Sequence, residues 1–316
     1  MHADARGARG SLADLDLELA RQLRNGSPAQ DRVPPGCEGS QRPLTAAPVL
    51  APFSVLADET HRPSYDLPEA LSQIYGRLGF ADRVLYSNFV SSLDGVVTVG
   101  SGISAGSVIS GKNQADRFLM ALLRACADAV VIGAGTLRAT PGHLWTPAHV
   151  YPDLASEFAS LRQTLGLGLE PRLVLLTATG DLDLKHPALV KGAVVLTTRA
   201  VADQIGSRLP PACEVIALGE GKTLNIKHAF GELTRMGMDV VLTEGGPHLM
   251  GELIKAQLLD EMFLTLSPVL AGRDKELRLG MVEGAELLPK LPVWSRLLSA
   301  RRHGDYLFLR YALPRP

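Results

Sequence analysis

Short apolar runs alternate with amphipathic segments along the chain from residue 82 onward. The apolar runs are rich in valine, leucine and isoleucine, a composition typical of strands buried on both faces. Between them lie segments whose apolar residues recur at helical spacing. Alternating strands and helices predict an α/β fold with a mostly parallel sheet. Strands are expected at 83–90, 128–133, 172–178, 193–198, 214–218, 239–243 and 261–267.

The clearest helix is predicted over residues 225–237. Asn225 can cap its start, its apolar residues form one stripe, and Gly237 ends it. Further helices are expected at 113–127 and 248–258. Residues 294–313 have the pattern of an antiparallel hairpin that turns near residues 303–305, so antiparallel edge strands should complete the sheet.

The first eighty residues differ in character from the rest. Residues 11–23 can form a short amphipathic helix, and residues 25–52 carry so many prolines and glycines that a disordered linker is expected. A second short helix within 67–80 should lean on the main domain. We therefore expect a partly disordered N-terminal extension with short helices over residues 1–80, and one domain over residues 81–316.

Composition and charge narrow the function. Hydrophobic residues make up 46% and charged residues 21%, a balance typical of globular proteins. The net charge of -1 and the absence of a basic stripe predict no nucleic-acid partner. No apolar run approaches the length of a membrane span, and the N-terminus lacks the apolar core of a signal peptide. The three cysteines, Cys37, Cys126 and Cys213, are far apart, as expected of reduced thiols in a cytoplasmic protein.

The stretch LTEGGPHLM, residues 242–250, ends a predicted strand on two glycines and begins a helix at once. Pro247 suits the first helical position, where its missing N–H is not needed. Gly245 and Gly246 therefore lie between the carboxyl end of a strand and the amino end of a helix, where parallel sheets bind ligands. Such a place favours a phosphate group. The alternative is a tight turn that needs glycine only for its backbone angles.

Two further strands end in short polar or small residues. One is followed by Gly133, Ala134, Gly135 and Thr136, a small-residue loop that lacks the dinucleotide fingerprint because Arg138 occupies its last position. An ordinary Rossmann dehydrogenase is therefore not expected.

The other strand ends in Thr197, Thr198 and Arg199, just before a helix. Hydroxyls and a guanidinium there suit a phosphate such as the 2′-phosphate of NADP. The alternative is that Thr198 is only a helix cap and Arg199 a solvated charge. Together with the glycine stretch, these two strand ends favour a nucleotide site.

Other signals are weaker. Residues 102–106 match G-x-S-x-G, but the passage that follows looks like a loop, whereas a hydrolase needs a helix there. No histidine or cysteine pairs have metal-ligand spacing, so no metal site is expected.

Three stretches, 87–106, 127–141 and 242–272, together resemble one family. They are similar to the reductase domain of riboflavin-biosynthesis deaminase/reductase proteins and to its stand-alone relatives. The resemblance extends over residues 82–313. It implies a dihydrofolate-reductase-like fold: a mostly parallel sheet with helices on both faces and a C-terminal antiparallel hairpin. It also implies a homodimer that reduces a phosphoribosylamino-pyrimidine to its ribitylamino form with NADPH.

The resemblance also implies roles for matching residues. The cofactor would be held by Gly245, Gly246, Pro247 and His248 at its diphosphate, by Gly133, Ala134, Gly135 and Thr136, and by Thr197, Thr198 and Arg199 near the adenosine ribose. Glu244 would border cofactor and substrate. Ser91, Ser92 and Asp94 would lie at the nicotinamide end, where Asp94 either holds the loop or transfers a proton. Arg117 would meet the substrate phosphate.

The chain departs from the family on the substrate side. Arg138, Ala139 and Thr140 stand where the family often has an aspartate pair, and the first eighty residues cannot form the zinc deaminase of the full-length proteins. The expected function is thus an NADPH-dependent pyrimidine reductase. The alternatives are a reductase of a pterin or dihydrofolate-like substrate and a non-catalytic NADP-binding protein.

Overall fold

The structure is a computed structural model that describes residues 50–100, 104–273 and 278–314. The chain divides into two compact units, Met1–Ala47 and Pro48–Pro316, and all described residues belong to the second. The helix expected at 11–23, most of the linker expected at 25–52, and Cys37 lie outside the described residues. Cys126 and Cys213 are free thiols.

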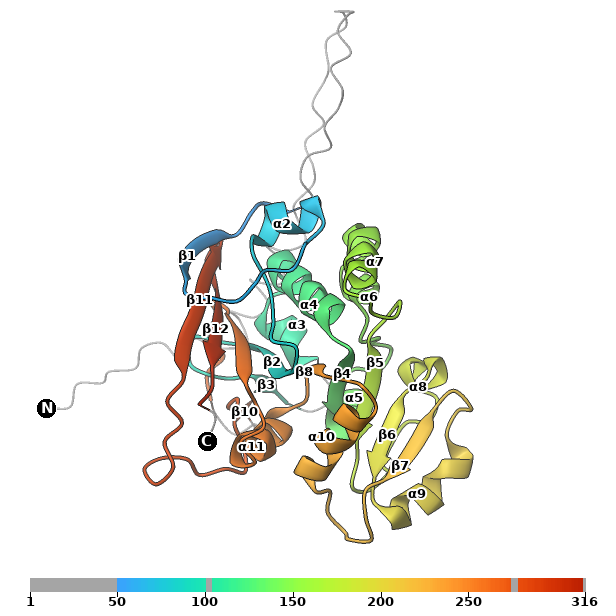
Figure 1. Cartoon of the computed structure of the whole chain (residues 1–316). Helices are drawn as coiled ribbons and strands as arrows, with labels where there is room; N and C mark the ends of the chain where they lie inside the picture. The colour runs from blue at the N-terminus through green and yellow to red at the C-terminus, as the bar shows by residue number, and fades with distance from the viewer. Residues whose placement is uncertain (1–49, 101–103, 274–277, 315–316) are drawn as a thin grey trace, which may run out of the picture. The chain divides into compact units, whose positions relative to one another are not determined.

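A ten-stranded sheet with the order β1-β11-β12-β9-β2-β8-β4-β5-β6-β7 is the framework of the described unit (Figure 1). A small two-stranded sheet pairs β3 with β10. The strands are β1 (Ser54–Asp58), β2 (Val84–Ser91), β3 (Thr98–Val99), β4 (Ala129–Gly133), β5 (Arg172–Leu176), β6 (Val194–Thr197), β7 (Glu214–Ala217), β8 (Val240–Thr243), β9 (Glu261–Leu266), β10 (Arg278–Leu279), β11 (Arg296–His303) and β12 (Tyr306–Ala312).

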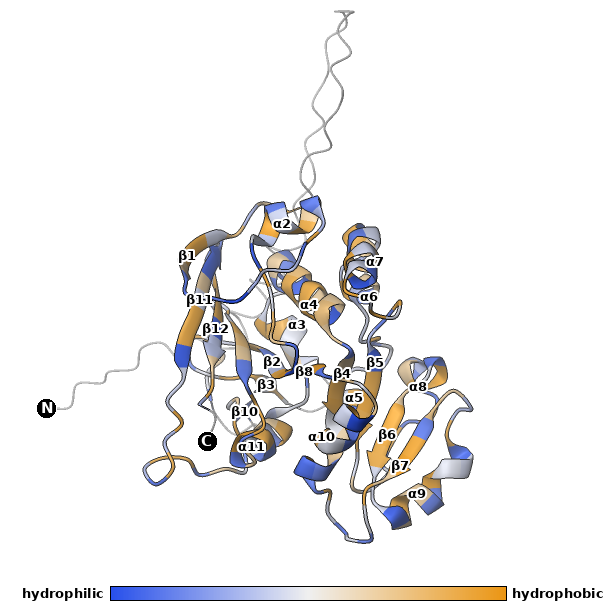
Figure 2. Ribbon diagram, viewed as in Figure 1, coloured by the Kyte–Doolittle hydropathy of each residue, from blue (hydrophilic) through white to orange (hydrophobic). Residues whose placement is uncertain are grey.

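The strands from β9 through β7 run parallel to one another, and β12, β11 and β1 add an antiparallel edge. Each expected strand is found, and the hairpin β11–β12 turns where predicted, with His303 paired to Tyr306. Strands β4, β5 and β6 are hydrophobic along almost their whole length, as Figure 2 shows, because both of their faces are covered.

Helices cover both faces of the sheet. One face packs against α2, α4, α7, α8 and α9, and the other against α10 and α11. This confirms the dihydrofolate-reductase-like architecture in its layers and its C-terminal hairpin. The helices are α2 (Glu69–Tyr75), α3 (Ala105–Ile109), α4 (Gln114–Cys126), α5 (Ala134–Ala139), α6 (Pro147–Val150), α7 (Ala155–Thr164), α8 (Pro187–Lys191), α9 (Arg199–Ile205), α10 (Ile226–Arg235) and α11 (Pro247–Lys255).

The three predicted helices begin where local chemistry allows them to. The Asn225 side chain accepts a hydrogen bond from His228 N at 3.0 Å and caps α10, and Pro247 begins α11. Asn113 caps α4 in the same way. At the other end of α4, Arg162 donates through Nη1 to the carbonyls of Arg124, Ala125 and Ala127, which helps to satisfy the carbonyl groups at the end of the helix.

Two short helices replace expected loops. The small-residue loop predicted after β4 is the first turn of α5, which begins at Ala134 directly after the strand. The passage after Ser104 is not a loop either, because α3 follows it at once. Helices this short fall below the length at which sequence periodicity identifies them.

Residues 50–80 belong to the compact unit, although we had assigned them to the extension. Strand β1 pairs with β11, and the expected short helix is α2. Arg301 of β11 fixes both: its Nε donates to Tyr75 O at 3.1 Å, and its Nη2 donates to Asp58 Oδ2 at 3.0 Å. The boundary at residue 81 therefore falls inside the packed unit.

Phe53 provides a test of this boundary. Its ring is 6% exposed and lies 4.8 Å from the ring centre of Phe308 and 6.0 Å from that of Phe118. We expect Phe53→Ala to lower the free energy of unfolding by about 3–5 kcal/mol, as for other buried phenylalanines. Urea denaturation of the full chain measures this difference.

The matched control is Val55→Ala, two residues further on in β1, where the side chain is 54% exposed. That variant should stay within about 0.5 kcal/mol of the parent. Equal, small effects of both substitutions would show that residues 50–58 contribute nothing to the fold.

Candidate functional site

A cavity of about 370 Å³ opens at the carboxyl ends of β2, β4 and β8, where parallel sheets bind ligands. Its floor comes from the end of β2 and from the turn after β8. Its walls come from α3, α4 and the segment between α5 and α6. Among the lining residues are Asn88, Ser104, Lys112, Asp116, Arg117, Met120, Arg124, Thr136, Ala139, Thr140, His143, Trp145, His149, Val150, Glu244, Gly245, Gly246 and Pro247.

A second cavity, of about 440 Å³, lies at the opposite, amino ends of β5, β6 and β7. Its charged side chains form ion pairs with each other, Lys191 with Glu170 and Arg172 with Glu214. Paired charges leave little for a ligand to bind, so the smaller cavity at the carboxyl ends is the candidate site.

A buried ion pair lies at the centre of this site. Arg124 of α4 donates to Glu244, the first residue after β8, through Nε to Oε1 at 3.0 Å and through Nη2 to Oε2 at 2.6 Å. The Arg124 side chain is 1% exposed and that of Glu244 is 10% exposed. Two parallel bonds of this kind fix the geometry of both groups.

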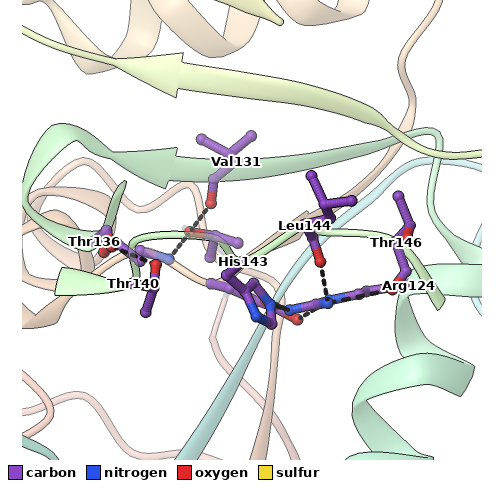
Figure 3. Close-up of polar contacts among 10 residues, drawn as sticks. Arg124, Val131, Thr136, Thr140, His143, Leu144 and Thr146 are labelled. Carbon is purple, nitrogen blue, oxygen red and sulfur yellow. Dashed lines mark hydrogen bonds and ion pairs between the residues drawn. The ribbon is translucent and has the colours of Figure 1, made fainter. Parts of the chain in front are cut away.

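The remaining guanidinium hydrogens of Arg124 bind the segment before α6. Nη1 donates to the carbonyls of Leu144 at 3.2 Å and Thr146 at 3.4 Å, as Figure 3 shows. Nη2 also lies 3.0 Å from His143 Nε2. Arginine can only donate hydrogen bonds, so His143 Nε2 must accept, and its proton must be on Nδ1.

The histidines of the cavity are held neutral. Burial, together with the neighbouring Arg124 charge, lowers the pKa of His143 to about 3. His149 lies against His143 with ring centres 4.8 Å apart, and burial together with Arg124 lowers its pKa as well. Neither ring carries a positive charge near neutral pH.

The two glycines after β8 are there for different reasons. A Cβ on Gly245 would lie 2.4 Å from Leu249 Cδ2, so packing against α11 requires glycine. A Cβ on Gly246 would meet only Thr136 Oγ1, at 3.8 Å, and its φ of -74° suits any residue. Neither packing nor backbone geometry therefore requires glycine at position 246. A ligand in the cavity that approaches the backbone closely would require it, because a side chain there would occupy the same space.

The start of α11 faces the same cavity. The first N–H groups of any helix lack acceptors within the helix, and no side chain caps them in α11. Pro247 lines the cavity and His248 is exposed beside it. This arrangement can bind an anion through backbone N–H groups and the helix dipole.

Of the small residues after β4, only Thr136 lines the cavity. Gly133 ends the strand, and Ala134 and Gly135 form the first turn of α5.

The strand end at Thr197, Thr198 and Arg199 lies at β6, two strands beyond β4, and none of its residues lines the cavity. The Thr197 hydroxyl donates to Thr177 O at 2.7 Å, and Arg199 lies 3.6 Å from Glu220. Thr198 is the N-cap residue of α9, without a side-chain bond.

Ser91 is the last residue of β2, Ser92 and Asp94 follow it, and none of the three lines the cavity. Asp94 accepts hydrogen bonds from the Ser92 hydroxyl at 2.6 Å and from the backbone N–H groups of Ala271 and Gly272. These bonds, the Ser92 bond first, lower the pKa of Asp94 to about 2. The arrangement favours the loop-holding role of Asp94 over proton transfer, since the carboxylate stays ionised near neutral pH.

Positive charge gathers at one wall of the cavity. Arg117 of α4 donates through Nε to Val150 O at 3.1 Å, and Lys112 precedes the same helix. Ser104 of the G-x-S-x-G stretch also lines the cavity, but its hydroxyl lies 3.2 Å from that of Ser107 rather than near a histidine. A serine nucleophile has no base here.

Sequence reasoning missed Arg124, His143, Asp116 and Asn88 as cavity residues. Arg124 did carry a signal, because an arginine stands inside the apolar stripe of its helix. Asp116 is likewise a carboxyl on the buried side of that helix. His143 and Asn88 carried no local signal, because only the tertiary fold brings them to the cavity.

No group of three histidine, cysteine, aspartate or glutamate side chains is placed to hold a metal ion within residues 50–100, 104–273 and 278–314. In the same ranges, every helix is too short or too polar to cross a membrane.

Comparisons with known proteins point in one direction. The family model described as RibD C-terminal domain matches residues 83–291. The 2,5-diamino-6-ribosylamino-4(3H)-pyrimidinone 5′-phosphate reductase of Aquifex aeolicus is 24% identical over 204 residues, which cover 63% of this chain and 83% of the relative.

Solved structures share the fold. A pyrimidine reductase-like protein from Corynebacterium diphtheriae superposes with a TM-score of 0.57 at 23% identity, covering 78% of this chain and 99% of its own. RibD from Acinetobacter baumannii gives a TM-score of 0.57 at 20% identity, covering 74% of this chain but only 58% of its own.

The Arg124–Glu244 pair yields a stability prediction. Glu244→Gln removes the negative charge and leaves a buried guanidinium without its counter-ion. We expect it to lower the free energy of unfolding by about 3–5 kcal/mol. Glu214→Gln is the control, because its pair with Arg172 is exposed and should contribute less than about 1 kcal/mol. Similar denaturation midpoints for both variants would contradict a central role for the buried pair.

Proposed function

The chain belongs to the RibD C-terminal domain family, and on that premise we propose that it is an NADPH-dependent reductase of a phosphoribosylamino-pyrimidine. The family match covers more than half of the chain, and the Aquifex relative is named as a reductase of such a compound. The observation that carries the proposal is the cavity beside Gly246. Packing within the described residues leaves room for a side chain at this position, so a ligand in the cavity would explain why it is glycine.

The cofactor half of the site would extend along the strand ends. Gly245, Gly246, Pro247 and His248 would hold the diphosphate at the start of α11, because free N–H groups there favour an anion. Thr136 also lines the cavity, and a Cβ on Gly246 would lie 3.8 Å from its Oγ1, so Thr136 would contact the same group, with Gly133, Ala134 and Gly135 beside it.

The preference for NADPH over NADH would come from the end of β6. Arg199 is exposed there and adjoins Thr197 and Thr198. A guanidinium held only by a 3.6 Å contact to Glu220 is available to a 2′-phosphate.

The substrate half lies between α4 and the end of β2. Arg117 and Lys112 would neutralise the phosphate of the substrate, and Trp145, Met120 and Val150 provide apolar wall that excludes water. Ser91 and Ser92 stay predictions for the nicotinamide end. When bound, NADPH supplies the hydride that reduces the opened ribosylamine. The protein's part is to align the two molecules. The Arg124–Glu244 pair, which is fixed by two parallel hydrogen bonds, holds this part of the cavity wall in place.

Two alternatives rest on the altered substrate side. Ala139 and Thr140 line the cavity where the family often has aspartates. That difference fits a pterin or dihydrofolate-like substrate, or a protein that binds NADP without catalysis. Turnover assays with each substrate distinguish these cases.

Three further expectations stay proposals. A reductase domain is supported by the family match at 83–291, but the domain begins before the expected boundary at residue 81, because residues 50–80 pack into the same unit. The homodimer is supported by the exposed apolar side chains of Leu288, Leu291 and Trp294, and sedimentation velocity measures its mass. Residence in the cytoplasm rests on the sequence alone.

Gly246→Val tests the cofactor site. The new side chain meets no atom of the protein closely, so the fold should persist while NADPH affinity falls at least a hundredfold, a loss of about 2.7 kcal/mol. Fluorescence titration with NADPH measures the affinity, and circular dichroism checks the fold.

Gly231→Val is its matched control. Gly231 lies in α10, is exposed, and is equally free of close neighbours. This variant should bind NADPH as the parent does. Unchanged NADPH affinity in Gly246→Val would show that the diphosphate does not bind beside this glycine.

A comparison of turnover by the parent and by Arg117→Met tests which substrate the protein reduces. The parent should oxidise NADPH when the phosphoribosylamino-pyrimidine is added, and Arg117→Met should raise KM by about tenfold to a hundredfold through loss of a charged contact. With the dephosphorylated substrate, the two proteins should differ little. Arg83→Met, at the opposite end of the sheet, should change neither value. Binding of NADPH without any turnover would favour the non-catalytic alternative.

A further inference from the structure

We propose that Asp116 is the proton donor of this reduction, giving its proton to the ring oxygen of the substrate as the ribose ring opens. Its carboxyl lies in the first turn of α4 and lines the cavity. The inference rests on the proposed function and adds a catalytic residue to it.

The chemistry requires one proton in each cycle. As the ribosylamine opens, the bond between C1′ and the ring oxygen breaks, and its electron pair leaves with the oxygen. That oxygen takes the proton and becomes a hydroxyl, while the amine nitrogen forms a double bond to C1′. Hydride from NADPH then adds to C1′, and NADP⁺ leaves. One proton and one hydride are consumed, and solvent restores the proton to the donor.

Glu244, the other carboxyl of the cavity, cannot supply this proton. Its two oxygens accept the parallel hydrogen bonds of Arg124 at 3.0 Å and 2.6 Å. Both oxygens of Glu244 are therefore already engaged as acceptors. Protonating it would leave the Arg124 charge buried without a counter-ion.

The two histidines of the cavity are excluded as proton donors because they are held neutral. His143 Nε2 accepts a hydrogen bond from Arg124, and burial keeps the pKa of the ring at about 3. His149 is likewise held neutral by burial and by Arg124. Neutral imidazoles with lowered pKa values do not hold a labile proton at neutral pH. Arg117 and Arg124 do not deprotonate in proteins.

Asp116 has the environment of a carboxyl that keeps its proton. It is 4% exposed, and burial raises its pKa to about 6. The groups that act on it are the hydroxyls of Thr265 on β9 and Ser110 after α3, the Arg117 charge on its own helix, and the Glu244 charge across the cavity. The hydroxyls and Arg117 favour the ionised form, but burial outweighs them, and Glu244 acts with burial.

The position of Asp116 suits a substrate contact. Asn113 accepts hydrogen bonds from Ala115 N and Asp116 N, which fixes the backbone at the start of α4. The same cavity also contains Asn88, whose Oδ1 is buried and has no partner among the described residues. A polar substrate would supply that partner.

Asp116→Asn in the full chain, compared with the parent, tests the proposal. The amide keeps the shape of the carboxyl but cannot give a proton. We expect kcat to fall by about a hundredfold or more, the usual contribution of a general acid. In the parent, kcat/KM should be constant at low pH and fall as pH rises above about 6, because the protonated form is required. The variant should lack this fall.

A second readout does not need turnover. The folded Asp116 binds its proton more tightly than the unfolded chain does, so this group stabilises the fold at low pH and loses that contribution as pH rises through about 6. The difference in unfolding free energy between Asp116→Asn and the parent should therefore shift in favour of the variant from pH 4 to pH 7. NADPH affinity should not change.

Asp153→Asn, an exposed carboxyl after α6, is the control and should match the parent in all these measurements. A variant Asp116→Asn that keeps kcat and its pH dependence, or changes only KM, would overturn the proposal. So would an unfolding difference that is constant with pH. If the parent itself binds NADPH but reduces no pyrimidine, the proposed function fails first and the proton-donor role fails with it.

Discussion

The buried pair of Arg124 and Glu244 is the interaction on which the site depends. A buried ion pair is favourable only when nearly every donor finds an acceptor, and here the guanidinium also binds Leu144 O, Thr146 O and His143. One side chain thereby joins α4, the turn after β8 and the segment before α6. Its charge also helps to keep His143 neutral. Asp116 remains as the second carboxyl that lines the cavity.

Local sequence patterns were sufficient where the structure depends on local chemistry. The apolar runs of β4, β5 and β6 are hydrophobic on both faces because both faces are covered. Asn225 caps α10 through a hydrogen bond three residues away. At the glycines before Pro247 the strand–helix order predicts either a ligand site or a tight turn, and the two other strand ends favour the ligand site. The fold brings these glycines to the cavity.

The rest depends on contacts between residues far apart in the chain. Arg124 and Glu244 are 120 residues apart, so no window of sequence contains their pair. The roles of Gly245 and Gly246 look alike in sequence and differ only through Leu249 and the open cavity. Asp94 resembles a catalytic aspartate until its bonds to Ala271 and Gly272 are known. Residues 50–80 looked like a tail because their partners lie near the other terminus.

The contact between β1 and β11 has a consequence for the protein during synthesis. Asp58 and Arg301 are separated by 243 residues, and among the described residues β1 pairs with β11 alone. The β1–α2 segment leaves the ribosome early, yet its place in the sheet exists only when the last strands have been translated. Until then Phe53, which is buried in the finished fold, lacks its ring neighbours His303 and Phe308. An early part of this unit therefore completes its docking late, and such long-range contacts slow folding.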